Sequence, residues 1–130
     1  MKPITEDFKS LVGRSHDMAN CWDIVREFYF KCFGVELKQY YQYYTGERKQ
    51  TESLIQSNYN DFSKVEFKDI NELQFGDIVI LKLHGVESHI GVICGMGKMF
   101  HSTKTSGSVI ESLDKWKTCI AGVYRLKDSQ

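Results

Sequence analysis

Residues 21–33 read CWDIVREFYFKCF and carry the pattern that decides the first half of the fold. Asn20 precedes the run as a good helix N-cap, Asp23 adds a carboxylate to the first turn, and Gly34 follows as a stop signal. The pattern predicts a helix over residues 21–33, with Cys21 in its first turn on the buried face. Apolar side chains recur at helical spacing along that face, at Cys21, Ile24, Val25, Phe28 and Cys32.

Beyond residue 75 the hydrophobic period changes from that of a helix to that of strands. Segments rich in β-branched and aromatic residues are separated there by glycine turns. We expect strands at Asp77–Leu83, His89–Cys94, Met99–Thr103, Ser108–Leu113 and Ile120–Leu126. A second helix is expected at Glu47–Ser57. This order predicts an α+β fold, in which the helix that bears Cys21 packs on a roughly five-stranded antiparallel sheet.

The composition is that of one ordinary globular domain, which we assign to residues 1–130 as a whole. Apolar residues make up 42% of the chain and charged residues 26%, which argues against disorder. Lys and Arg number 17 and Asp and Glu also number 17, so the net charge is zero. A nucleic-acid-binding protein usually has a basic excess, and we therefore expect no nucleic-acid partner.

The ends of the chain and its apolar runs bear on where the protein is made. Residues 1–7 are polar, and no apolar segment of a signal peptide follows them. No run approaches the roughly 18 apolar residues that span a bilayer, so membrane insertion is not expected. We expect a protein made without a signal peptide, in a reducing compartment that keeps thiols free.

The four cysteines form no CxxC pair, so a structural zinc site has little support. Cys32, Cys94 and Cys119 are most simply interpreted as small core residues. Cys21 differs from them, because the N-terminus of a helix lowers the pKa of a thiol placed there and so favours the nucleophilic thiolate.

Two histidines lie on neighbouring predicted strands. His89 begins one strand, and His101 lies on the next strand across the turn at Gly95–Gly97. With a three-residue loop, His101 faces Gly91 and becomes a diagonal neighbour of His89, about 7 Å away. A two-residue turn would place the two histidines on opposite faces of the sheet. A catalytic arrangement of a cysteine with these two histidines needs the three-residue loop.

Such an arrangement of Cys21, His89 and His101 suits nucleophilic catalysis. His89 would accept the thiol proton, and His101 would orient and polarise the His89 ring. Gly91 between them would leave room for their close approach. Two alternatives stay open at this point: the three residues are also compatible with structural roles in the core, and together they form a donor set for zinc.

Two blocks of the chain resemble the NlpC-type cell-wall peptidases, in the family's order and over roughly residues 8–125. Residues 20–29, NCWDIVREFY, resemble the helix that carries the nucleophile, and they look most like the version found in bacteriophage tail proteins. Gly34–Leu37 followed by Tyr40 is also similar to that subgroup. The second block resembles the family's central strand and its two histidine strands, at Gly76–Val79, Ser88–Ile93 and Gly97–Ser102.

The resemblance implies a papain-like fold that hydrolyses an amide bond in the peptide stem of peptidoglycan through a thioester, with no metal and no other cofactor. It implies that Cys21 is the nucleophile, His89 the general base and His101 the residue that holds the His89 tautomer. The backbone N–H of Cys21 would contribute to an oxyanion hole, and His16 is a candidate second donor in the place of a family tyrosine. Candidates for substrate binding are Tyr40, Tyr43 and Ser88.

The chain departs from the family pattern around the cysteine. Asn20 stands where an aspartate is usual, and Asp23 and Ile24 replace a glycine–leucine pair. The loop between Gly13 and Cys21 is short. These departures leave the efficiency of catalysis and the choice of substrate open.

Three functions are consistent with these observations. The first is a stem-peptide peptidase assembled with other proteins into a phage virion tail, which would carry the domain to the cell wall without a signal peptide. The second is a structural tail-tip or hub protein on the same fold, with catalysis weak or lost. The third is an amidase or acyltransferase that acts on small γ-glutamyl compounds.

Overall fold

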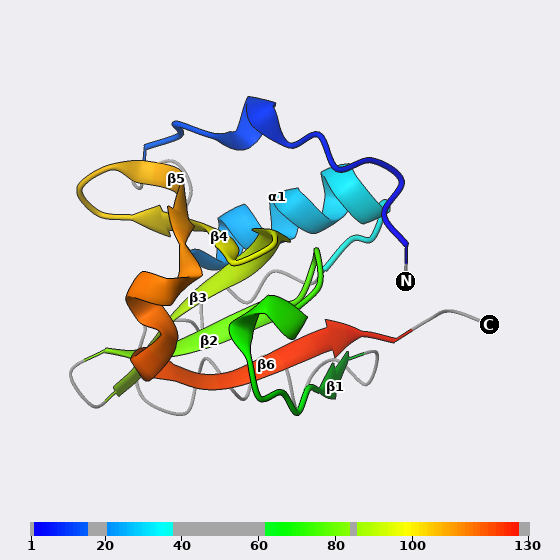
Figure 1. Ribbon diagram of the computed structural model, residues 1–130. Coiled ribbons are helices and arrows are strands. Elements are labelled where there is room, and N and C mark those ends of the chain that lie inside the picture. Colours follow the sequence, from blue (N-terminus) through cyan, green and yellow to red (C-terminus); the bar gives the residue numbers. More distant parts are fainter. Residues whose placement is uncertain (1, 16–20, 38–61, 84–85, 128–130) are drawn as a thin grey trace.

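The computed structural model describes residues 2–15, 21–37, 62–83 and 86–127 (Figure 1). The predicted helix Glu47–Ser57 lies outside these residues. In chain order the described elements are η1 (Lys9–Leu11), α1 (Cys21–Phe33), β1 (Phe62–Lys64), η3 (Ile70–Glu72), β2 (Ile78–Leu83), β3 (Val86–Gly95), β4 (Lys98–Thr103), β5 (Gly107–Ser112), η4 (Leu113–Cys119) and β6 (Ile120–Leu126).

The described strands form one antiparallel sheet in the order β1-β6-β2-β3-β4-β5. Strands β2 to β5 follow one another as a meander, whereas β6 returns to lie between β1 and β2. The α+β prediction is confirmed. The described sheet has one strand more than the roughly five expected, because Phe62–Lys64 adds a sixth strand at the edge. Three residues are too few to show an alternating pattern, so only pairing with β6 defines this strand.

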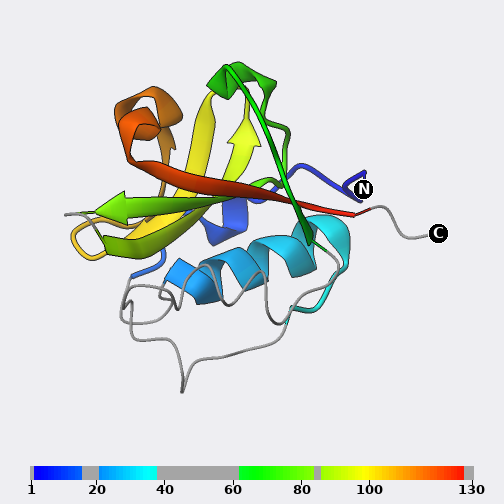
Figure 2. The same ribbon diagram turned by 90° about the horizontal axis from the view of Figure 1, so that it is seen from below.

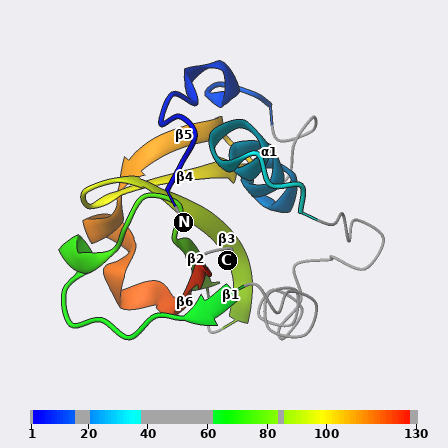
Figure 3. The ribbon, with the colours of Figure 1, turned by 90° about the vertical axis from the view of Figure 1, so that its right-hand side faces the viewer.

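Two layers cover the sheet, and Figure 2 shows them on opposite faces: α1 on one side, and η3 and η4 on the other. Side chains alternate along a strand, so the central strand β2 feeds both layers. Ile78 and Ile80 pack in the cluster that includes α1, whereas Val79 and Leu81 pack in the cluster that includes η4. Figure 3, which looks along the sheet, shows that it is strongly curved.

Helix α1 begins at Cys21 and ends at Phe33, which confirms the predicted bounds. It packs against β3 and β4. Phe28 is fully buried on its inner face, with ring centroids 5.2 Å from Phe8 and 6.0 Å from Phe100. Full burial of one such side chain contributes about 1.5–3 kcal/mol, so this face holds the helix on the sheet. The expected cap, Asn20, lies outside the described residues.

Gly76, just before β2, is where the helix meets the start of the central strand. Its φ is +95°, a conformation that favours glycine, and an added Cβ would lie 2.5 Å from an atom of the Phe33 ring. The Tyr29 hydroxyl donates a hydrogen bond to the Gly76 carbonyl. A side chain at position 76 would therefore push α1 away from the sheet.

Asp77 follows Gly76 and holds the other side of β2. Its carboxylate is 1% exposed, and it accepts hydrogen bonds from Nε and Nη2 of Arg125, each at 2.8 Å. The backbone N–H of Gln74 donates to the same carboxylate at 2.8 Å. The hydrogen bonds to Asp77 raise the pKa of Arg125. This two-pronged ion pair ties the start of β2 to the end of β6.

The turn between β3 and β4 differs from the prediction. The catalytic arrangement was expected to need a three-residue loop over Gly95–Gly97, but β4 begins opposite Gly95, so the turn has two residues. Cys94 is an extra residue in β3, a bulge, and Ile93 still pairs with Met99. The expectation that a two-residue turn would separate the two histidines is wrong, because the bulge restores the register that the longer loop would have given.

We predict that Arg125→Met lowers the free energy of unfolding by about 3 kcal/mol, since it leaves the buried Asp77 carboxylate without its cation. Urea denaturation measures this change. Lys127→Met, which removes an exposed cation nearby, is the matched control and should change stability by less than about 0.5 kcal/mol. Equal losses in the two variants would contradict the assigned role of the Asp77–Arg125 pair.

Candidate active site

Cys21 is the first residue of α1, and its side chain is buried, with 6% exposed. Backbone N–H groups at the start of a helix have no acceptor within that helix, and the helix dipole favours negative charge there. The helix packs against β3 and β4, the strands that carry His89 and His101. The predicted position of Cys21 is confirmed, whereas its role as a nucleophile stays a prediction.

The structure brings His89 and His101 into direct contact. Nε2 of His89 lies 2.7 Å from Nδ1 of His101, and the ring centroids are 5.0 Å apart with the planes at 75°. His101 is fully buried, and His89 is half-buried. Nε2 of His89 is turned to His101, so a proton that His89 takes from another group would go to Nδ1, the second ring nitrogen.

Gly91 makes this contact sterically feasible. A Cβ at Gly91 would lie 2.7 Å from Sδ of Met99 and 3.2 Å from Cβ of His101. Both distances are shorter than ordinary van der Waals contact, so a larger residue at position 91 would displace the Met99 side chain and press against His101. The expectation that Gly91 leaves room beside the histidines is confirmed.

Glu111 continues the chain of polar groups beyond His101, and the sequence reasoning missed it. Oε1 of Glu111 lies 2.7 Å from Nε2 of His101, and Nζ of Lys115 donates to Oε2 at 2.7 Å. Across the β4–β5 pair, His101 is opposite Val109, so Glu111 is its diagonal neighbour. The predicted strands Met99–Thr103 and Ser108–Leu113 would have set His101 opposite Ile110, so only the observed register, with Thr103 opposite Gly107, brings Glu111 to His101.

The pKa values of His101 and Glu111 are both lowered, mainly by burial for His101 and mainly by hydrogen bonding for Glu111. Burial lowers the pKa of His101, although its hydrogen bond to Glu111 opposes this change. The hydrogen bond from Lys115 lowers the pKa of Glu111, with a further contribution from His101. At neutral pH, Glu111 is therefore a carboxylate that faces a neutral imidazole.

Trp116, on η4, lies against both imidazoles. Its ring centroid is 6.4 Å from that of His89, with the planes nearly parallel at 30°, and 5.6 Å from that of His101, nearly edge-on at 78°. The indole Nε1 is buried, with no hydrogen-bond partner in the described part of the chain. Trp116 is half-buried and shields the hydrogen bond between the histidines from one side.

Several predicted site residues lie outside what the structure describes. These are the proposed second oxyanion donor and two of the three substrate-binding candidates, namely His16, Tyr40 and Tyr43. The third, Ser88, belongs to β3, but its side chain lies outside the described part. Their roles stay predictions.

The described residues are 2–15, 21–37, 62–83 and 86–127. No group of three or more His, Cys, Asp or Glu side chains within them could hold a metal ion. No helix within them is long and apolar enough to cross a membrane.

A model of the NlpC/P60 family matches residues 10–125, which is nearly the whole chain. The chain belongs to the NlpC/P60 family. This family is one of cysteine peptidases and amidases that act on the peptides of bacterial peptidoglycan. A search of curated proteins gave no match. The resemblance to NlpC-type peptidases is therefore confirmed at the level of the family.

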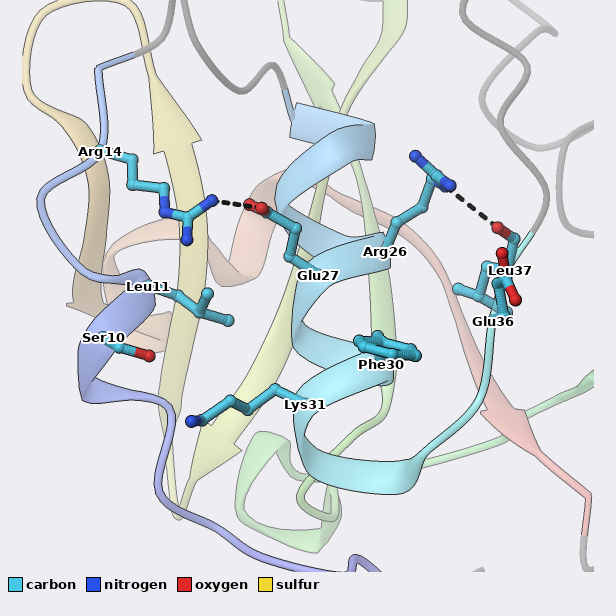
Figure 4. A pocket seen from close by; sticks show the side chains of 9 residues that line it. All are labelled: Ser10, Leu11, Arg14, Arg26, Glu27, Phe30, Lys31, Glu36 and Leu37. Carbon is cyan, nitrogen blue, oxygen red and sulfur yellow. Dashed lines mark hydrogen bonds and ion pairs between the residues drawn. The ribbon is translucent and has the colours of Figure 1, made fainter.

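A hollow of about 700 Å³ lies on the outer side of α1 in this NlpC/P60 domain (Figure 4). Arg14 pairs with Glu27 on one side of it, and Nε of Arg26 donates to the Leu37 carbonyl at 3.0 Å on the other. Phe30, which is 65% exposed, lies between these pairs and the end of the helix. None of Cys21, His89 and His101 lines the hollow, so it is separate from the candidate catalytic residues.

We predict that the NlpC/P60 domain loses stability on acidification, in part through His101. The pKa of His101 in the folded state is lowered, so the unfolded chain binds a proton first as the pH falls below about 6.5. The stabilisation from a neutral His101 is complete above this pH and is lost as the pH falls toward the folded pKa. Urea denaturation at pH 7.5 and 5.5 measures this loss of stability. The difference in the free energy of unfolding between the two pH values should be smaller in His101→Gln than in the wild type.

Proposed function

We propose that this protein is a cysteine peptidase that hydrolyses an amide bond in the peptide stem of bacterial peptidoglycan. Cys21 is the nucleophile, His89 the general base and His101 the residue that orients His89. The observation that carries the proposal is the 2.7 Å contact between His89 Nε2 and His101 Nδ1, within a family domain whose helix α1 begins at Cys21.

In this mechanism Nδ1 of His89 takes the proton of the Cys21 thiol, and the thiolate attacks the carbonyl carbon of the scissile amide. The negative charge that develops on the carbonyl oxygen is stabilised by the N–H of Cys21 at the helix start. The imidazolium of His89 returns its proton to the leaving amine, which leaves a thioester. His89 then takes a proton from water, and the hydroxide attacks the thioester. The acyl group leaves as a carboxylic acid, and the His89 imidazolium returns its proton to the Cys21 sulfur, which regenerates the thiol.

We further propose that the domain works as a component of a bacteriophage tail. The support is the likeness of residues 20–29 and 34–37 to the tail-protein version of the family. In this setting the chain is made in the bacterial cytoplasm and assembled with other tail proteins into the virion. Local opening of the cell wall during penetration is the task that stem-peptide cleavage would serve there.

We predict that iodoacetamide alkylates Cys21 faster than the other three cysteines at pH 6. Burial raises the pKa of Cys32 and of Cys94 to about 11, so both are thiols at this pH. Cys94 and Cys119 are nonetheless more exposed than Cys21. If access alone governed the rates, these two would react first, so faster reaction at Cys21 requires a thiolate there. Peptide mapping by mass spectrometry measures the four rates, and equal rates would exclude the catalytic role.

We predict that the wild type releases new amino termini from purified peptidoglycan and that Cys21→Ala does not. The activity should fall by at least about 1000-fold, since the variant lacks the nucleophile. Cys94→Ala, which removes a half-buried thiol outside the proposed mechanism, is the matched control and should keep most of the activity.

Mass spectrometry of the fragments identifies the bond that is cut. Activity confined to small γ-glutamyl dipeptides would favour the amidase alternative over stem-peptide hydrolysis. The absence of product from wild type and variant alike would contradict the peptidase proposal and favour a structural tail protein.

A further inference from the structure

His101 is a buried imidazole with a polar partner at each ring nitrogen. Its side chain has no exposed surface, and it lies between His89 at Nδ1 and Glu111 at Nε2, both at 2.7 Å. A neutral imidazole carries one proton, so one of its nitrogens donates while the other accepts. Which nitrogen donates decides the direction of the whole chain of hydrogen bonds.

Glu111 removes this ambiguity on the side of β5. An ionised carboxylate has no proton and only accepts hydrogen bonds. The ammonium of Lys115 holds the other carboxylate oxygen at 2.7 Å, which keeps Glu111 ionised and fixes its orientation. The ion pair is partly exposed to solvent, since 22% of the Glu111 side chain and 64% of the Lys115 side chain are exposed. The His101 imidazole that Glu111 faces is fully buried.

We propose that Glu111 is a positioning residue of the active site, which fixes the tautomers of His101 and His89 so that the base nitrogen of His89 is Nδ1. The consequence of this positioning for catalysis rests on the proposed function, whereas the assignment of the tautomers does not. Glu111 touches no reacting atom; it acts through His101.

The chain of hydrogen bonds then has one direction. Glu111 accepts from Nε2–H of His101, so Nδ1 of His101 has the lone pair. Nδ1 of His101 in turn accepts from Nε2–H of His89, so the lone pair of the His89 ring lies on Nδ1. The other direction would need a proton on Nδ1 of His101, and its Nε2 lone pair would face the carboxylate at 2.7 Å, which is repulsive.

The negative charge of Glu111 also favours the protonated, charged form of His89. When His89 takes the thiol proton it becomes an imidazolium, and a carboxylate one imidazole away stabilises this cation. Trp116 covers the two rings, and low exposure strengthens such an interaction. The titratable groups that the structure places around His101 are His89 from β3, Glu111 from β5 and Lys115 from η4.

The tautomers are tested directly by long-range ¹H–¹⁵N NMR of the histidine side chains at pH 7.5. In the wild type we expect both His101 and His89 to carry their proton on Nε2. In Glu111→Gln we expect His101 to populate both tautomers, because the isosteric amide both donates and accepts. A wild-type His101 with its proton on Nδ1 would overturn the inference, and so would a Glu111→Gln spectrum identical to that of the wild type.

The catalytic consequence is tested on the same variant. Glu111→Gln should lower kcat about 10-fold with KM unchanged, and should slow the alkylation of Cys21 at pH 6 by a similar factor. Asp114→Asn removes a neighbouring carboxylate on η4 that pairs with Lys117 and not with His101. This control should match the wild type in kcat, in KM and in the rate of Cys21 alkylation.

The outcomes separate the two proposals. A wild type that does not cut peptidoglycan contradicts the proposed function, while the NMR spectra still decide the role of Glu111. Active wild type with an unchanged kcat in Glu111→Gln overturns the positioning role and leaves the proposed function intact.

Discussion

The buried carboxylate of Asp77 is the constraint on which the rest of the structure depends. It sits at the start of the central strand β2 and is neutralised by the two-pronged contact with Arg125 of β6. The carbonyl of the preceding residue, Gly76, accepts a hydrogen bond from the Tyr29 hydroxyl of α1. The Phe33 ring occupies the space that a side chain at position 76 would need. One dipeptide therefore sets how the helix and the last strand lie against the centre of the sheet.

The position of the candidate catalytic groups follows from this frame through strand register. β3 pairs with β2, β4 with β3 and β5 with β4, so each strand passes its register to the next. The bulge at Cys94 adjusts this register by one residue and brings His101 opposite Gly91. Three residues that are distant in sequence, His89, His101 and Glu111, then become successive diagonal neighbours on one face.

The resulting polar chain is a local feature in a protein whose net charge is zero. It runs from Lys115 at the surface through Glu111 and His101 to His89, and each member has a partner at hydrogen-bond distance. A satisfied network of this kind specifies one arrangement of its groups, whereas a half-satisfied one would cost more than an apolar core. Membership of the NlpC/P60 family gives this arrangement a chemical context in the hydrolysis of cell-wall peptides.

The sequence by itself determined the elements that depend on local periodicity. The bounds of α1, the position of Cys21 at its start and the β2 and β6 strands all follow from side-chain spacing and flanking glycines. The family could also be recognised from the sequence, because the resemblance rests on residues in two short blocks. The short strand β1 was missed, since three residues carry no periodic signal and only the pairing with β6 creates it.

Only the tertiary structure decided the contents of the site beyond the two histidines. Whether a two-residue turn separates or joins His89 and His101 depends on the bulge, which is a property of the paired strands and not of either one alone. Glu111 and Trp116 reach the imidazoles from β5 and η4, through a register and a packing arrangement that no local pattern encodes. The spacing of side chains along the sequence fixes the helix and most of the strands, because these elements form through interactions between residues that are close in the sequence. A polar chain across three strands exists only once those strands are aligned.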